Sequence, residues 1–283
     1  MTPLRKKLID ELTLSGFAPR TQKNYLRYVV DLARFHKRSP EQISPEEVRS
    51  YLALKVREKK ASLSTVRVIG NALSFFYQRV LHTQLLLEDI RPKKPIRNPT
   101  IFSVQEIERI LTWEKLSHRY RVFFITAYAT GLRVGEVCHL KVEDLLADRN
   151  QIRVRQGKGR KDRYTVLFPK LLEELRDYWR LYRPCLWLFP RSTDPRLCLH
   201  PRSAQAAFLR AKTGVGLAHR GGLHCLRHSF ATHMLEAGVP LNTLQGWLGH
   251  ARLTTTAHYL HFVQPDVDSI RSPLELIDLS QIK

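Results

Sequence analysis

The sequence predicts a mainly α-helical protein with one small antiparallel β-sheet, an α+β arrangement in two domains. Apolar residues recur at helical spacing through residues 1–90 and again from residue 101. One stretch, 151–168, alternates apolar and polar residues around a glycine-containing turn, which is typical of a β-hairpin. Between the two helical regions lies RPKKPIRNPT (91–100), whose three prolines and four basic residues are typical of an interdomain linker.

The first domain, residues 1–90, is predicted to hold four short amphipathic helices with basic outer faces. In PRTQKNYLRYVVDLARFHK one helical face carries Tyr25, Val29, Leu32 and then Phe35 or His36. Ser44 with Glu47 three residues later matches a capping box, and Ser62 or Ser64 is expected to cap a further helix.

In the second domain, residues 101–283, Ser103 and Glu106 form a predicted capping box at a helix start. The stretch YRVFFITAYATG is almost entirely apolar, so we expect a central buried helix. The hairpin pattern alternates through Ile152, Val154, Tyr164, Val166 and Phe168. An amphipathic helix is expected in PKLLEELRDYWRLYR, and three or more helices are expected after residue 201.

Charge is the most informative feature of the composition. The chain has 47 Lys and Arg against 26 Asp and Glu, a formal net charge of +21. Residues 1–100 hold 20 of the basic and 9 of the acidic residues, so both domains are basic. A polyanion that touches both domains is the natural partner, although basicity alone also fits a ribosome-associated protein.

The sequence favours a cytoplasmic protein. It has no run of eighteen apolar residues, so no membrane span is expected. MTPLRKKLIDELTLSG lacks the apolar core of a signal peptide. The four cysteines form no CxxC pair, which indicates packing thiols in a reducing compartment.

The segment LHCLRHSFATHML (223–235) crowds three histidines and an arginine into one predicted helix. His224 and His228 share a face, but the second position of an HExxH zinc motif is Cys225 and no third ligand follows, so metal is the weaker interpretation. His224 and Arg227 also share a face near the helix start, which favours an anion. They are expected at the edge of the core, beside a buried stripe of Leu223, Leu226 and Phe230. A surface salt bridge is the plainer alternative.

Three further motifs carry polar residues in suggestive places. TGLRVGEVCHL sets Arg133 beside an apolar helix, where it needs an anion or an ion pair with Glu136. GKGRKDR is a cationic hairpin tip with Lys158 between two glycines, which could equally be a solvated turn. WLGHARLTTTAHYLH carries His250 and Tyr259, and a lone tyrosine is most often core or interface.

Taken together, the motifs TGLRVGE, GKGRKDR, HCLRH, LGH and TTTAHY in this order resemble the tyrosine recombinases, or phage integrase family, and especially its compact Xer-like members. Each motif alone is weak, but all five span about 130 residues in the family's order. The helices of residues 1–90 resemble the family's SAM-like core-binding domain. The resemblance implies a C-shaped clamp on double-stranded DNA, with residues 101–283 as catalytic domain and tail.

The resemblance also implies a phosphate-binding site. Arg133 and Arg227 would hold the nonbridging oxygens of one scissile phosphate, because guanidinium groups bind such oxygens in pairs. His224 would support proton transfer, His250 would donate to the same phosphate, and Glu136 would steady the Arg133 turn or His224.

For the reaction itself, the resemblance implies Tyr259 as the nucleophile and Lys158 as the general acid for the departing 5′-oxygen. No metal or other cofactor is implied, because the guanidinium groups stabilise the charge, and the chain has no Walker-type loop. His228 and His233 are expected to serve structure, and the role of His258 is open.

The implied function is site-specific recombination or integration of DNA, as in mobile elements. A homotetramer would cleave and rejoin strands through a 3′-phosphotyrosyl intermediate and a Holliday junction, with accessory DNA-bending or directionality proteins as further partners. The tail SPLELIDLSQI would dock on a neighbouring subunit or pack on its own domain. The alternatives are a catalytically silent architectural factor and a type IB topoisomerase-like nicking-closing enzyme. A nucleoid-associated location follows from the same resemblance.

Overall fold

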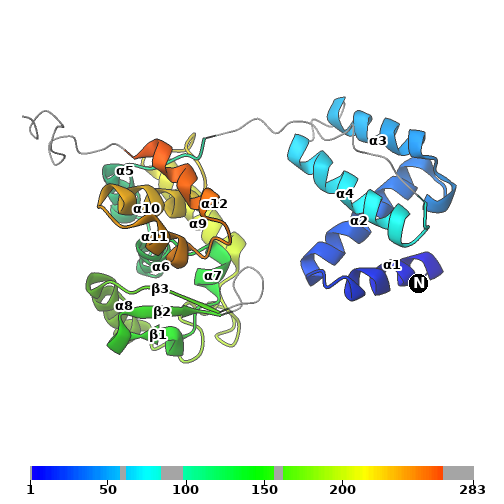
Figure 1. Cartoon of the computed structure of the whole chain (residues 1–283). Helices are drawn as coiled ribbons and strands as arrows, with labels where there is room; N and C mark the ends of the chain where they lie inside the picture. Colours follow the sequence, from blue (N-terminus) through cyan, green and yellow to red (C-terminus); the bar gives the residue numbers. More distant parts are fainter. Residues whose placement is uncertain (1, 58–61, 84–97, 156–161, 264–283) are drawn as a thin grey trace, which may run out of the picture. The chain divides into compact units, whose positions relative to one another are not determined.

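A computed structural model describes residues 2–57, 62–83, 98–155 and 162–263. The chain divides into two compact units, Met1–Arg97 and Asn98–Lys283 (Figure 1). Each unit has its own apolar core. Among the described residues, no helix is both long and apolar enough to cross a membrane.

The N-terminal unit consists of helices packed around one core. Its elements are α1 (Pro3–Leu14), α2 (Pro19–His36), the 3₁₀ turn η1 (Pro40–Gln42), α3 (Pro45–Arg57) and α4 (Leu63–Arg79). Helix α4 packs against both α2 and α3. The four helices predicted from periodicity are therefore confirmed. Their buried side chains include Leu12, Leu32, Val48, Leu52, Leu73 and Phe76.

Helix starts in this unit follow the predicted caps. The backbone N–H of Glu47 donates to Ser44 Oγ at 3.3 Å, and the N–H of Ser44 donates to Glu47 Oε2 at 2.8 Å. Ser62 Oγ accepts from the N–H of Thr65 at 3.2 Å. These bonds satisfy amide groups that the first helical turn leaves without partners.

The C-terminal unit is mainly helical with one small sheet. Figure 1 shows the strands along one side of the helices. Its helices are α5 (Val104–Thr112), α6 (His118–Thr130), α7 (Val134–Cys138), α8 (Pro169–Tyr182), α9 (Pro201–Gly214), α10 (Cys225–Glu236), α11 (Leu241–Leu248) and α12 (Leu253–Ala257). The 3₁₀ turns are η3 (Val142–Asp144), η4 (Ala147–Arg149) and η5 (His258–Phe262). The predicted capping box of Ser103 and Glu106 starts α5, and the apolar stretch forms α6, with Val122, Phe123 and Phe124 buried as expected.

The sheet has the order β1-β2-β3 and is antiparallel throughout, which confirms the predicted hairpin. Its strands are β1 (Leu145–Leu146), β2 (Gln151–Val154) and β3 (Arg163–Val166). Ile152 and Val154 are buried, but the predicted alternation is wrong in β3, where Thr165 is buried and Tyr164 is 46% exposed. Because Ile152 pairs with Thr165, both side chains point to the same face. The Thr165 hydroxyl stays satisfied by donating to the Thr130 carbonyl at 3.1 Å.

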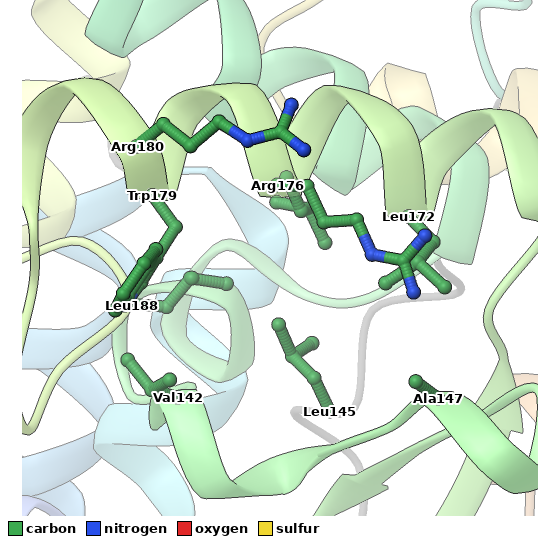
Figure 2. Close-up of a pocket in the computed structure, with 9 residues that line it drawn as sticks. Val142, Leu145, Ala147, Leu172, Arg176, Trp179, Arg180 and Leu188 are labelled. Carbon is green, nitrogen blue, oxygen red and sulfur yellow. The ribbon is translucent and has the colours of Figure 1, made fainter.

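A cavity of about 410 Å³ lies between α8 and the η3–β1 segment (Figure 2). Leucines and Val142 form most of its wall, and the guanidinium groups of Arg176 and Arg180 extend from α8. None of the residues predicted to form the functional site lines it. The candidate site lies instead where α6, α7, α10, α11 and η5 meet.

Candidate active site

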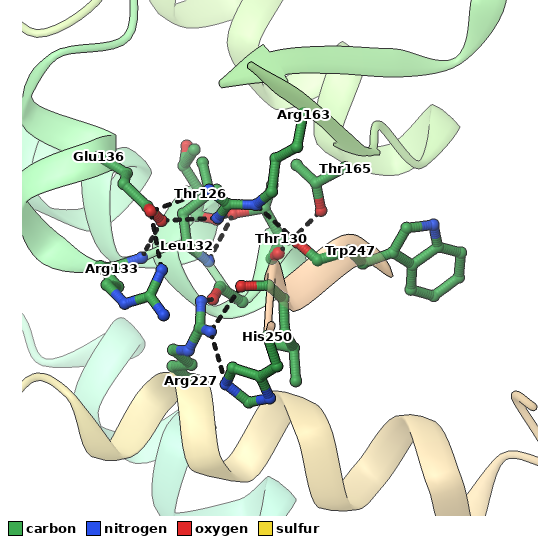
Figure 3. A network of polar contacts seen from close by, with 12 residues as sticks. Thr126, Thr130, Leu132, Arg133, Glu136, Arg163, Thr165, Arg227, Trp247 and His250 are labelled. Carbon is green, nitrogen blue, oxygen red and sulfur yellow. Dashed lines mark hydrogen bonds and ion pairs between the residues drawn. The ribbon is translucent and has the colours of Figure 1, made fainter. Parts of the chain in front are cut away.

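Arg227, in the first turn of α10, is fully buried at 2% exposure. The prediction that it lies at the edge of the core is wrong. Its Nη1 donates to the Gly131 carbonyl at 2.7 Å, and its Nη2 donates to the Leu248 carbonyl at 2.7 Å and lies 2.9 Å from His250 Nε2 (Figure 3). The apolar stripe around it, Leu223, Leu226 and Phe230, is buried as predicted.

The buried charge of Arg227 is stabilised by two helix ends. Gly131 follows α6 and Gly249 follows α11, both with positive φ (61° and 63°), so each helix ends in a left-handed cap. Carbonyls at helix C-termini carry partial negative charge. None of the described residues offers Arg227 a carboxylate. Burial, followed by the charge of Arg133, lowers the pKa of Arg227 to about 10, so it remains cationic at neutral pH.

Glu136 joins two further arginines. The expected ion pair is present: Arg133 Nη1 donates to Glu136 Oε1 at 2.9 Å, and the Arg133 N–H donates to Oε2 at 2.9 Å. Arg163 binds the same carboxylate through both Nη1 and Nη2, at 2.9 and 2.8 Å (Figure 3). Although burial alone raises the pKa of Glu136, the hydrogen bonds and charge of Arg163 and then Arg133 lower it to about 2. Glu136 is therefore a carboxylate across the physiological range.

Arg163 was not predicted as a site residue. It is the last residue of GKGRKDR and the first of β3, and its register partner is Val154. Since Val154 points inward, so does Arg163. Its Nε also donates to the Trp247 carbonyl at 3.3 Å. If the pairing of Val154 with Arg163 were known, strand alternation would predict that Arg163 points inward. That pairing depends on the length of the turn, which cannot be read from the sequence.

His250 bridges Arg227 and α12. Because arginine only donates hydrogen bonds, His250 Nε2 accepts from Arg227, and Nδ1 then carries the ring proton. Nδ1 lies 2.9 Å from Thr256 Oγ1, which accepts that proton. The ring also lies almost parallel to that of Tyr259, with centroids 6.4 Å apart and 11° between the planes. Hydrogen bonding thus orients His250 on the edge of Arg227.

Tyr259, in η5, is buried at 4% exposure. Its hydroxyl lies 2.8 Å from His228 Nδ1. Burial raises the pKa of Tyr259, and the charges of Arg227 and then Arg133 partly offset this effect. His228, which the sequence placed among structural histidines, therefore contacts the predicted nucleophile directly. His233 contacts Tyr128 of α6 instead.

His224 occupies the N-cap position of α10, with an exposed side chain. Its ring centroid lies 4.8 Å from that of His228, at an interplanar angle of 84°. Partial desolvation, followed by the charges of Arg227 and Arg133, lowers the pKa of His224. Lys158 lies outside the described residues. The site therefore brings together Arg133, Glu136, His224, Arg227, His250 and Tyr259.

The segment before His224 is held by Lys212 of α9, which is 4% exposed. Its ammonium donates to the carbonyls of Ala218 and Gly221 at 3.0 Å and to that of Arg220. Three carbonyls satisfy the three donors of the ammonium group. A lysine in an amphipathic helix gives no sequence signal for such a role.

Among the described residues, no group of three His, Cys, Asp or Glu is arranged to hold a metal ion.

Residues 101–264 match the Phage integrase family, and residues 4–86 match the phage integrase N-terminal SAM-like domain. The putative integrase/recombinase y4qK of Sinorhizobium fredii is 39% identical over 282 residues, covering 98% of this chain and 90% of the relative. Tyrosine recombinase XerA of Pyrococcus furiosus is 31% identical and covers 90% of each chain.

Solved structures support the same fold. A lambda integrase(75-356) dimer bound to a COC′ core site has a TM-score of 0.75 at 20% identity, covering 90% of this chain and 93% of the other. A lambda integrase tetramer bound to a Holliday junction also has a TM-score of 0.75 at 20% identity, covering 95% and 78%. With both units matched and relatives similar along nearly its whole length, the chain belongs to the phage integrase family and is a tyrosine-type site-specific recombinase.

Proposed function

We propose that this recombinase cleaves and rejoins duplex DNA through a covalent 3′-phosphotyrosyl intermediate formed by Tyr259. One observation carries the proposal: Arg227 is a buried cation that touches no carboxylate among the described residues, and its charge acts on the buried Tyr259 hydroxyl. A surplus buried charge is costly unless a partner completes it. A scissile phosphate is the partner that a tyrosine nucleophile would require.

In this mechanism Arg227 and Arg133 bind the nonbridging oxygens of the phosphate. The Tyr259 oxygen attacks phosphorus while the bond from phosphorus to the 5′-oxygen breaks, and Lys158 gives that oxygen a proton. Charge grows on the nonbridging oxygens during attack, so fixed cations in a water-poor site stabilise the transition state more than the ground state. Religation reverses each step, and the phosphotyrosyl bond conserves the energy of the cleaved bond.

The other site residues orient these groups. His250 holds the edge of Arg227. When the phosphate replaces Arg227 at His250 Nε2, the ring changes tautomer, so that Nε2–H donates to the phosphate and Nδ1 accepts from the Thr256 hydroxyl. His224 supports proton transfer at the exposed side. Glu136 fixes the Arg133 turn and keeps Arg163 in place. Its very low pKa fits this role, because a permanent carboxylate is a stable anchor and a poor proton donor.

We further propose the assembly that residue composition supports. Residues 1–90 and the catalytic domain from residue 101 are both basic, so they would close on duplex DNA as a clamp joined by the linker 91–100. A homotetramer would carry strand exchange through a Holliday junction, with the tail SPLELIDLSQI docking on a neighbouring subunit. Accessory DNA-bending or directionality proteins would set the direction of the reaction.

The test is a trap for the covalent intermediate. A nicked duplex carrying flanking sequence from the chain's own locus is incubated with wild type, Tyr259→Phe and Arg133→Ala in EDTA. We expect a denaturation-resistant adduct from wild type only, while Tyr259→Phe still shifts the DNA in a gel. Tight binding by wild type without any adduct would reject the proposal in favour of an architectural factor. Relaxation of supercoils without paired sites would instead indicate a nicking-closing enzyme.

A further inference from the structure

We propose that His228 accepts the proton that leaves the Tyr259 hydroxyl as its oxygen attacks phosphorus. This inference rests on the proposed function of Tyr259 as nucleophile. It assigns a catalytic role to a histidine that the motif comparison left in the structural group.

Among the described residues, His228 is the hydrogen-bond partner of the Tyr259 hydroxyl. Tyr259 Oη and His228 Nδ1 are 2.8 Å apart, a hydrogen-bond distance at which a proton can transfer. Tyr259 is 4% exposed, so bulk water has little access to its hydroxyl. A neutral phenol must lose its proton to form the phosphotyrosyl bond. The structure thus offers a direct acceptor in the geometry that transfer requires.

The surroundings keep His228 neutral before DNA binds. Burial, followed by the charges of His224 and Arg227 and then His258, lowers the pKa of His228 to about 4. A neutral imidazole has a lone pair on one nitrogen and can accept a proton. The groups that face it are His224 at the N-cap of α10, Arg227 on α10, and His258 and Tyr259 on η5. A phosphate bound at Arg227 would offset that positive charge and so raise the pKa of His228 toward that of a useful base.

The ring of His228 packs against that of His224, which is exposed. The two rings are 4.8 Å apart between centroids and lie edge to face. His224 is exposed, whereas Tyr259 is buried. The series Tyr259, His228, His224 therefore runs from the buried hydroxyl to the surface.

The step balances without any further reagent. During cleavage the Tyr259 O–H bond breaks, its proton moves to His228 Nδ1, and its oxygen forms the bond to phosphorus. The bond to the 5′-oxygen breaks, and the proposed general acid supplies the proton that this oxygen needs. During religation the 5′-hydroxyl attacks, and the imidazolium of His228 returns the proton to the leaving Tyr259 oxygen.

The same helix contains a matched pair without this role. His233 Nδ1 lies 2.8 Å from the hydroxyl of Tyr128, and the rings are edge to face at 5.9 Å. Burial lowers the pKa of His233 as well. Tyr128, however, belongs to α6, and the hydrogen bonds described for Arg227 go to Gly131, Leu248 and His250 instead. His233→Asn is therefore a control that removes a His–Tyr hydrogen bond from α10 while leaving the proposed chemistry intact.

The experiment separates proton acceptance from positioning. His228→Asn keeps a hydrogen-bonding atom near the place of Nδ1 but removes the basic nitrogen, and His228→Ala removes both. Single-turnover cleavage of the nicked duplex is measured for both variants, for His233→Asn and for wild type. We expect His228→Asn and His228→Ala to lose about a hundredfold or more, with DNA binding unchanged. His233→Asn should stay within about threefold of wild type.

Two chemical substitutions distinguish loss of proton removal from Tyr259 from loss of proton donation to the 5′-leaving group. When sulfur replaces the bridging 5′-oxygen of the substrate, the 5′-leaving group departs without protonation. This substrate should therefore rescue Lys158→Ala but not His228→Asn. Fluorotyrosine at position 259, whose hydroxyl is more acidic, should recover at least tenfold of the His228→Asn defect. The cleavage rate of His228→Asn should also rise steadily with pH, because phenolate must then form without an acceptor.

Several results would overturn the inference. Wild-type rates for His228→Asn together with a large loss for His228→Ala would assign His228 to positioning alone. Rescue by the sulfur substrate, or no gain from fluorotyrosine, would place the defect on the leaving group or the fold. Adduct formation by wild type and by Tyr259→Phe tests the nucleophile separately. If wild type forms no adduct, or if Tyr259→Phe still forms it, the proposed function is rejected and the role of His228 is rejected with it.

Discussion

Two polar networks in the C-terminal unit border the same hairpin and differ in how their charges are matched. The Asp144 network consists of Lys141, Glu143, Asp144, Arg153 and Arg155. Arg153 Nε and Arg155 Nε contact Asp144 Oδ1 at 3.1 and 2.7 Å, and Arg155 Nη2 contacts Glu143 at 2.6 Å. Lys141 Nζ lies 3.5 Å from Glu143. Each cation of this network touches a carboxylate.

The site network consists of Arg133, Glu136, Arg163, Arg227 and His250 (Figure 3). One carboxylate, Glu136, serves both Arg133 and Arg163. Arg227 is buried and is bound by carbonyls and His250 in the described part of the chain. The network is therefore positively charged, with Arg227 buried in the core and the Arg133 side chain 32% exposed.

The difference separates a network that stabilises the fold from one that is built for a ligand. Cations that each contact a carboxylate have complete ion pairs in the free protein, while a buried cation without such a contact has to be stabilised by dipoles until an anion arrives. The C-terminal carbonyls of α6 and α11 supply those dipoles. Mutations in the two networks should therefore separate stability from catalysis.

The largest effect is expected at Arg227. Arg227→Lys keeps a positive charge but cannot bind two carbonyls, His250 and a phosphate at once, so single-turnover cleavage should fall by about a thousandfold. The measurement is adduct formation on the nicked duplex at saturating protein. Arg153→Lys makes the same exchange in the Asp144 network and should stay within about threefold of wild type. Equal losses in both variants would contradict the distinction between the networks.

Glu136 is expected to control acid stability. Its pKa of about 2, against an ordinary value of 4.5, corresponds to about 3 kcal/mol of stability at neutral pH. Because the folded-state pKa is lowered, this contribution is present above pH ~4.5 and is lost as the pH falls toward 2. Urea unfolding of the DNA-free protein at a series of pH values should show a steeper loss in wild type than in Glu136→Gln. Glu143→Gln, at a 60% exposed side chain, is the control and should follow wild type.

The local elements of the fold could be predicted because their signals lie close together in the sequence. Ser103 with Glu106 and the apolar run of α6 each need only a few neighbouring residues. The alternation of β3 was wrong because the turn length sets its phase. The same uncertainty concealed Arg163, whose inward direction depends on its pairing with Val154.

Buried polar residues of the site could be predicted by type but not by environment. Periodicity assigns an arginine to the surface, and nothing near Arg227 in the sequence shows that carbonyls 96 and 21 positions away will bind it. The contact of His228 with Tyr259 likewise depends on η5 returning to α10. Lys158 and the tail SPLELIDLSQI lie outside the described residues, and their roles stay predictions.

Asp144 is expected to matter for stability and little for chemistry. Its side chain is 1% exposed and binds two arginines, so Asp144→Asn should lower the free energy of unfolding by about 2 kcal/mol. Cleavage at saturating DNA, measured at a temperature where the variant is fully folded, should stay within about fivefold of wild type. A loss like that of Arg227→Lys would show that the Asp144 network positions the hairpin tip for catalysis.

The smallest difference is expected between alanine substitutions at Gly249 and Gly238, which separate backbone from side-chain constraints. Gly249 has φ of +63°, and a Cβ there would lie 2.5 Å from Arg163 Cδ and Nε. Gly238 has φ of +80° with no atom within 4 Å of such a Cβ. Both alanine substitutions carry a left-handed backbone penalty of about 1 kcal/mol. Gly249→Ala should lose about 1 kcal/mol more, because the middle of the Arg163 side chain must move.

Only Gly249→Ala should also slow adduct formation, since moving Arg163 disturbs its bonds to Glu136 and the start of the segment that carries His250. Thermal unfolding and single-turnover cleavage of the two variants measure both effects. Equal losses of stability with unchanged cleavage would mean that Arg163 can move without disturbing Arg133. In that case Glu136 alone, rather than the shared pair of arginines, would hold the Arg133 turn, and the surplus charge of the site would rest on Arg227.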